Sequence, residues 1–204
     1  MILRYIEEFL NYLRVVKNAS KLTLVSYRTD LEQYFQFLAR RHGADVEDLD
    51  LNKIDHKSVR EYLSVLQQQG MQRSTMARKL AALRSFVRYL CRENVLPSNP
   101  IAAVATPKQD QRLPNFLYPI EVAQLIEAPD ISKPLGMRDR ALLELLYATG
   151  IRVSELVGLN AADLNRQQGV IKVAGKGGKE RIVPLGKQSA EFLSRYLKVR
   201  ESLL

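Results

Sequence analysis

The stretch Tyr147-Ala-Thr-Gly-Ile-Arg-Val-Ser-Glu-Leu-Val-Gly-Leu159 predicts a helix that ends at Gly150 and a short helix that begins near Val153. Glycine ends helices because it adopts the left-handed backbone conformation without a steric penalty. Arg152 lies at the corner between these helices, where a guanidinium and the N–H groups of a helix start can hold a phosphate. Glu155 follows one turn later and is expected to orient Arg152. Taken alone, residues 148–155 fit an arginine paired to a local carboxylate better.

A glycine-rich turn follows, between two runs of β-branched residues. Residues 169–174 and 179–183 flank Gly175-Lys-Gly-Gly178, and together they predict an antiparallel β-hairpin. Glycines let a lysine at the tip, Lys176, approach a ligand closely, where it acts as a cationic clamp or a general acid. Lys179 and Arg181 lie beside it. A solvated glycine turn is the alternative for this segment alone.

The rest of the chain has the 3.6-residue periodicity of helices. In the N-terminal part it predicts four helices, over about 2–16, 20–43, 56–70 and 74–93, with Ser20 and Asp55 as N-caps. Further helices are expected over 119–127, over 135–149, and from Lys187 to the last residue. The proline density between Leu96 and Pro119 predicts a semi-extended linker. We therefore expect a mainly α protein with domains 1–96 and 117–204, joined by a linker over 97–116.

The chain is basic, and most of the surplus lies near the N-terminus. The 204 residues carry 31 Lys and Arg against 22 Asp and Glu, a net charge of +9. The first 108 residues hold 17 of the basic and 11 of the acidic side chains. On the fourth helix the arginines occupy a face separate from the apolar stripe; they are Arg73, Arg78, Arg84, Arg88 and Arg92. Such a face suits the phosphates of a DNA groove, and a solvated charged face is the general alternative.

The cysteine and histidine content indicates which settings and cofactors to expect. One cysteine, Cys91, and no signal peptide predict a reducing, cytoplasmic setting. No apolar run is long enough for a membrane span, so no membrane partner is expected. Two histidines and one cysteine form no cluster spaced for a metal. We therefore expect neither a metal nor another cofactor.

Residues 147–159 and the segment Gly175-Lys-Gly-Gly-Lys-Glu-Arg-Ile-Val-Pro-Leu185 closely resemble the tyrosine recombinases of the phage integrase family, in particular the bacterial Xer type. Arg112-Leu-Pro114, residues 138–143 and the arginine helix over 74–90 are similar to that family as well. The resemblance covers the whole chain. It implies a four-helix, SAM-like core-binding domain that clamps DNA. An incomplete, α-rich catalytic domain with a small antiparallel sheet would follow it.

The resemblance also implies roles for individual residues. Arg152 matches the first catalytic arginine, which holds the scissile phosphate, and Glu155 matches a supporting acidic position. Lys176 matches the hairpin lysine, a proposed general acid for the 5′-hydroxyl leaving group. The expected DNA-binding residues are Arg73, Arg78, Arg84, Arg88, Arg92, Lys179 and Arg181. The implied chemistry is a metal-free transesterification through a 3′-phosphotyrosyl intermediate, used in site-specific recombination for chromosome dimer resolution, chromosome partition and cell division.

The sequence departs from this family in one respect. His-x-x-Arg, a later His or Trp, and the nucleophilic tyrosine are not among the 204 residues, and Tyr196 is expected to be a packing residue. The chain is therefore expected to bind double-stranded DNA without cleaving it alone. The alternative is a non-cleaving DNA-binding paralogue or remnant that occupies recombination sites. The implied partners are a second recombinase in a tetrameric synapse and a septal DNA translocase. We also expect an under-packed apolar surface at Leu142, Leu143, Leu145, Leu146 and Val157.

Overall fold

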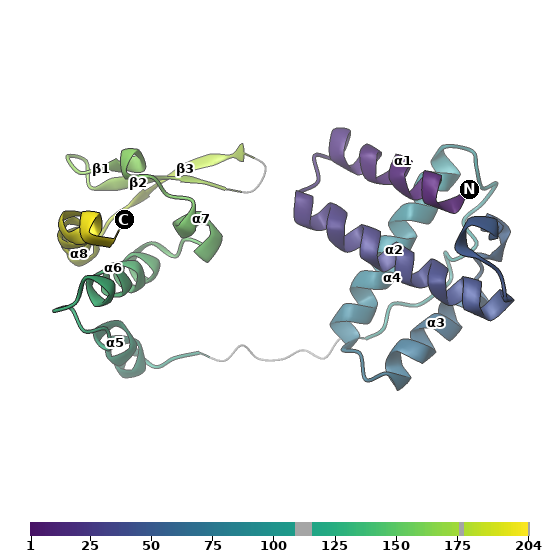
Figure 1. Cartoon of the computed structure of the whole chain (residues 1–204), viewed down its shortest axis with the longest axis horizontal. Helices are drawn as coiled ribbons and strands as arrows, with labels where there is room; N and C mark the ends of the chain where they lie inside the picture. Colours follow the sequence, from purple (N-terminus) through teal and green to yellow (C-terminus); the bar gives the residue numbers. More distant parts are fainter. Residues whose placement is uncertain (109–115, 176–177, 204) are drawn as a thin grey trace. The chain divides into compact units, whose positions relative to one another are not determined.

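The computed structural model describes residues 1–108, 116–175 and 178–203. The chain divides into two compact units, Met1–Arg112 and Leu113–Leu204. Figure 1 shows an all-helical first unit and a second unit that combines helices with a small sheet. The expected mainly α fold class is confirmed. No helix in the described residues is long and apolar enough to cross a membrane.

Four helices build the first unit: α1 (Ile2–Val15), α2 (Lys21–His42), α3 (His56–Gln68) and α4 (Arg73–Arg92). The predicted caps form, because Ser20 accepts a hydrogen bond from the Thr23 amide at 3.2 Å and Asp55 accepts one from the Ser58 amide at 2.6 Å. The chain between α2 and α3 makes two 3-10 turns, Val46–Asp48 and Leu51–Lys53. The sequence did not predict these turns.

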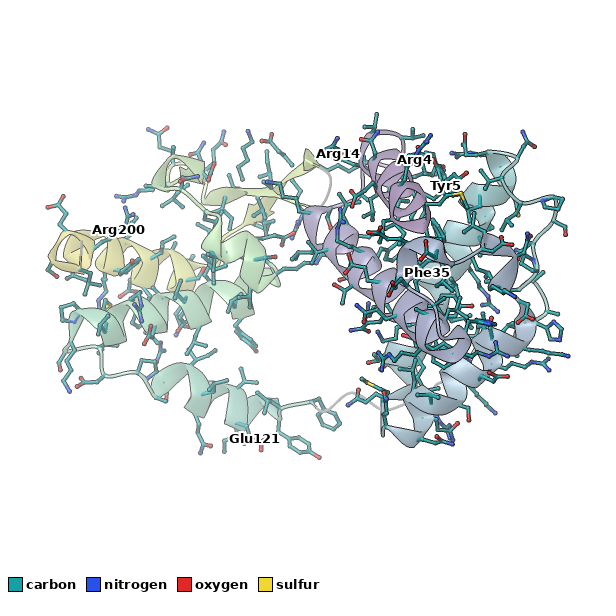
Figure 2. The ribbon with its side chains drawn as sticks, turned by 45° about the vertical axis from the view of Figure 1, so that its right-hand side comes forward. Arg4, Tyr5, Arg14, Phe35, Glu121 and Arg200 are labelled. Carbon is teal, nitrogen blue, oxygen red and sulfur yellow. The ribbon has the colours of Figure 1, made fainter. Side chains whose placement is uncertain are left out.

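The core of the first unit is rich in aromatic side chains. Phe86 of α4 meets Phe9 of α1 at 5.5 Å and Phe35 of α2 at 5.8 Å between ring centroids, both edge to face. Phe35 lies inside the helical bundle in Figure 2. The predicted stripe of α4 is buried against this centre at every position, namely Met76, Leu80, Leu83, Val87 and Leu90. Because one side of α4 is buried, its other side is left for charged residues.

The residues after α4 also belong to this core. Leu96, Ile101 and Val104 are buried among the helices. The first part of the segment that the proline content placed in a linker therefore packs on the first unit through Ile101 and Val104, while most of residues 97–108 are exposed. Apolar side chains at Ile101 and Val104 explain this, since their burial outweighs the extended backbone that the prolines favour.

The second unit begins with α5 (Pro119–Glu127), α6 (Pro134–Thr149) and α7 (Val153–Val157), followed by a 3-10 turn, Ala161–Asp163. Strands β1 (Leu164–Asn165), β2 (Val170–Ala174) and β3 (Glu180–Pro184) form an antiparallel sheet in the order β1-β2-β3. The predicted hairpin is present as β2 and β3. The two-residue strand β1 was not predicted, because so short a segment has no alternation to detect.

The last helix, α8 (Lys187–Val199), is shorter than predicted. A 3-10 turn, Arg200–Leu203, follows it instead of a continued α-helix. In Figure 1, α6 and α8 lie side by side below the sheet, and α5 lies on the far side of α6. Leu145, Ile151, Leu156, Ile171 and Val173 form the buried core between these helices and the sheet.

Candidate functional site

The corner between α6 and α7 positions Arg152. Gly150 ends α6 in the left-handed conformation, with φ at +60°, and Arg152 caps α7 with extended backbone angles. The Arg152 amide donates to Glu155 Oε2 at 2.8 Å. This bond fixes the backbone of the corner, while the Arg152 side chain remains 72% exposed.

Glu155 is the centre of the site, because two arginines share its carboxylate. Arg152 Nη1 donates to Oε1 at 2.9 Å. Arg181 on β3 donates to both oxygens, at 2.8 Å each. The Glu155 side chain is only 5% exposed. The cluster ties β3 to the corner across 26 residues of sequence.

These contacts determine how Glu155 titrates. Hydrogen bonds from Arg181 and from the Arg152 amide hold the pKa of Glu155 well below its ordinary value of 4.5. A carboxyl with a lowered pKa in the folded state stabilises the fold above its unfolded pKa, and that contribution is lost as the pH falls through the folded pKa. Glu155 is therefore ionised, and stabilising, at neutral pH.

The hairpin lies next to this cluster. The Gly175 amide donates to the Lys179 carbonyl at 2.6 Å and closes the base of the turn. Lys179 is exposed. Lys172 of β2 and Glu180 of β3 form an exposed ion pair at 2.8 Å. Lys176, the expected general acid, lies outside the described residues.

Arg84, Arg92 and Arg78 of α4 make side-chain contacts with other residues of the first unit. Arg84 donates to Thr106 Oγ1 at 2.7 Å and to the Val104 carbonyl, so it anchors the segment that follows the helix. The Arg92 guanidinium lies 3.8 Å from the ring centre of Tyr12 and pairs with Glu93 at 2.8 Å. Arg78 pairs with Asp30 of α2 and remains about half exposed. Glu93 is the next residue in the chain, whereas Thr106, Asp30 and Tyr12 come from distant parts of it.

The remaining two arginines reach the surface. Arg88 is exposed, and Arg73 is also exposed and donates a hydrogen bond to the Lys108 carbonyl at 3.4 Å. The structure therefore places the five arginines along one helix, but in different surroundings.

Sequence reasoning missed a buried charged pair on this helix. Lys79 is 4% exposed and donates to Asp30 Oδ1 at 3.1 Å, while Asp30 itself is 1% exposed. A signal was present in the spacing. Asp30 lies three residues after Tyr27 and four before Tyr34, on the apolar stripe of α2. A charged residue at such a position predicts a buried partner.

The apolar surface expected in the second unit is present in part. A pocket of about 430 Å³ lies between α6, α7, the sheet and α8, and Leu142, Leu145 and Val157 line it. Tyr196 lines the same pocket, next to Leu193 and Leu197. Its position agrees with a packing residue.

Comparison with known proteins matches each unit to a family model. Residues 6–94 match the N-terminal SAM-like domain of phage integrases, and residues 115–203 match the phage integrase family. A tyrosine recombinase XerC from Pelotomaculum thermopropionicum is 51% identical over 98% of this chain and 66% of its own length. A XerD from Staphylococcus haemolyticus is 40% identical over the same shares, and a XerC from Thermodesulfovibrio yellowstonii is 43% identical over 98% and 63%.

Solved structures have a similar fold. The XerH recombinase bound to a palindromic difH substrate is 26% identical, with a TM-score of 0.66 over 96% of this chain and 57% of that one. A lambda integrase dimer on a core site has a TM-score of 0.69 at 22% identity, over 94% of this chain and 67% of that one. The second likeness supports the fold alone.

The SAM-like bundle and the integrase-type unit with its arginine corner define a two-part integrase fold. The chain belongs to the phage integrase family, that of the tyrosine recombinases. It spans about two thirds of the length of the relatives it matches, or slightly less.

Proposed function

We propose that this chain is the DNA-gripping part of a site-specific tyrosine recombinase of the Xer type. The observation that carries the proposal is the Arg152 corner. A largely exposed guanidinium is fixed by its backbone beside a buried carboxylate, in a chain 51% identical to a tyrosine recombinase. A guanidinium in this setting holds the non-bridging oxygens of a phosphodiester.

In the proposed reaction, a tyrosine hydroxyl gives up its proton to water, attacks the phosphorus and displaces the 5′-oxygen. A 3′-phosphotyrosyl bond forms as the bond to the 5′-oxygen breaks, and the leaving oxygen takes a proton. We assign that proton to Lys176 and the stabilisation of the pentacoordinate transition state to Arg152. Attack by a free 5′-hydroxyl of a partner strand reverses the step and releases the tyrosine. No residue of this chain is assigned as the nucleophile.

The first unit is proposed to supply the grip on the duplex. Its candidate contacts are Arg73, Arg78, Arg84, Arg88 and Arg92, with Lys179 of the hairpin added from the second unit. Arg88 is the best placed of these, because it is exposed and makes no ion pair with the described residues. Phosphate contacts of this kind give affinity on any sequence and do not select bases.

The proposed biological setting is that of the Xer recombinases. There the chain would act in the cytoplasm in chromosome dimer resolution. It would pair with a second recombinase in a four-protomer synapse and respond to a septal DNA translocase. These partners follow from the family and remain proposals for this chain.

Arg88→Ala is expected to weaken binding to duplex DNA of any sequence and to reduce the salt slope of the affinity by about 0.9, one phosphate contact. Fluorescence anisotropy at several salt concentrations measures both. Arg4→Ala on α1 is the matched control, since it removes the same charge from an exposed side chain that pairs with Glu8. Equal slopes for the two variants would assign Arg88 to the solvated surface.

The 204 residues are expected to bind a nicked suicide substrate without forming a covalent adduct. The reason is that no tyrosine of the chain has the place of the nucleophile in the family pattern. Denaturing gel electrophoresis after incubation detects the adduct. A protein–DNA band that resists denaturation would refute the assignment. The single Tyr→Phe variant in which this band disappears would then identify the nucleophile.

A further inference from the structure

Glu155 is held by two guanidinium groups in different ways. Arg181 places both terminal nitrogens on the carboxylate, at 2.8 Å each. The Arg152 side chain contributes one nitrogen, at 2.9 Å. A two-bond contact fixes carboxylate and guanidinium in one plane and is the stronger arrangement. Arg181 is therefore the principal partner of Glu155.

Arg152 keeps most of its donors toward solvent. A guanidinium has five N–H groups. The Arg152 side chain makes a single hydrogen bond, to Glu155, among the residues that the structure describes. It is 72% exposed, against 42% for Arg181. An anion can therefore reach Arg152 without the loss of a buried contact.

The charges of the three groups favour this outcome. Glu155 carries one negative charge and faces two positive ones, so the cluster has a net charge of +1. If Arg152 were the only cation at Glu155, an incoming anion would compete with that carboxylate for it. Because Arg181 neutralises Glu155, the positive charge of Arg152 stays available to the anion.

We propose that Arg181 is a positioning residue, which holds Glu155 so that Arg152 can bind a phosphate of the DNA backbone. This inference rests on the proposed function, and it replaces the expected contact between Arg181 and DNA. The surroundings of Arg181 support it. A Cβ on Gly175 would lie 3.5 Å from Arg181 Nη1 and 3.7 Å from Glu155 Oε1, so the base of the hairpin already borders the pair.

The protonation state of Glu155 offers a second test of whether Arg181 holds this carboxylate and leaves Arg152 available to an anion. Hydrogen bonds from Arg181 contribute most to the lowered pKa of Glu155, so Arg181→Ala should raise that pKa toward 4.5. Acidification of the variant would then protonate Glu155 and free Arg152. Within the described residues, the other charged groups that line a pocket with Glu155 are Lys172, Glu180 and Asp163. They are the same in both proteins, so the comparison isolates Glu155.

The test titrates inorganic sulfate into the 204-residue chain and follows the Arg152 Nε–Hε signal by NMR. Sulfate is a tetrahedral dianion whose charge is constant over the acidic and neutral range. Arg152→Lys assigns the signal. The variants are Arg181→Ala, Glu155→Gln and the double variant, where Gln retains an oxygen for the Arg152 amide. Thermal unfolding by circular dichroism checks each fold.

If Arg181 positions Glu155, Arg181→Ala should weaken the affinity for sulfate about tenfold. The double variant should bind sulfate with an affinity within about threefold of that of the wild type. Acidification should strengthen binding in Arg181→Ala more than in the wild type. A double variant as weak as Arg181→Ala would overturn the proposal in favour of direct anion contact, and an unaffected Arg181→Ala would overturn it as well. If Arg181→Ala does not fold, Arg181→Lys replaces it, with a smaller loss and the same rescue by Glu155→Gln. Absence of a sulfate response in the wild type would instead refute the phosphate site of the proposed function.

Discussion

Asp30→Ala is expected to lower the free energy of unfolding of the first unit by about 3–5 kcal/mol, because it leaves the Lys79 ammonium buried without its counter-ion. The same carboxylate also pairs with Arg78. Loss of Asp30 therefore removes two ion pairs between α2 and α4, the helix that carries the arginines. Urea denaturation followed by circular dichroism measures the change.

Glu32→Ala is the matched control for this experiment. Glu32 lies on the same helix, has a side chain that is 41% exposed, and faces Arg28 at 3.9 Å. A surface pair of this kind contributes about 0–1 kcal/mol. The double variant Asp30→Ala/Lys79→Met should recover most of the lost stability, since no buried charge remains. Equal effects of Asp30→Ala and Glu32→Ala would contradict a buried-charge origin.

Glu144→Ala is expected to have a comparable effect on the second unit, about 3–5 kcal/mol. Glu144 of α6 is buried and pairs with the buried Arg140 at 2.8 Å. It also accepts a hydrogen bond from Gln188 of α8 at 2.9 Å. The substitution leaves the Arg140 guanidinium over the Phe192 ring without its carboxylate partner. It also removes the hydrogen bond between Gln188 of α8 and Glu144 of α6.

Hydrogen exchange locates this effect. The amides of α8 should lose protection in Glu144→Ala before those of α2, which belongs to the other unit. Glu191→Ala on α8 is the control, because Glu191 is exposed and lies 4.0 Å from Arg195. Unchanged protection of α8 in Glu144→Ala would show that apolar packing alone holds the helix.

Local patterns in the sequence were enough to predict most of the fold. The caps at Ser20 and Asp55, the buried stripe of α4, the end of α6 at Gly150 and the β2–β3 hairpin each depend on residues within one or two turns of each other. Such patterns are visible along the chain. The packing of Ile101 and Val104 depends on helices far away in sequence, and the proline content concealed it.

The candidate site was predicted only in part, for the same reason. Arg152 and Glu155 are three residues apart, so their pairing follows from helical geometry. Arg181 joins them across 26 residues, and Arg84 meets Thr106 across 22. From the sequence, Arg181 and Arg84 were predicted to bind DNA, because their charge is visible in it. The distant residues with which they pair are not.

The open edge of the sheet has a consequence for association between copies of this chain. Among the residues that the structure describes, β3 is the last strand of the order, and the outer edge of such a strand favours pairing with another strand. Its sequence opposes such pairing, because Glu180 and Arg181 put opposite charges at its start and Pro184 removes an N–H at its end. Ile182, exposed at the middle, is the position where a second strand would gain most. The residues at the two ends of β3 thus oppose pairing between copies of the chain. A substitution that made those ends apolar would favour association through this edge.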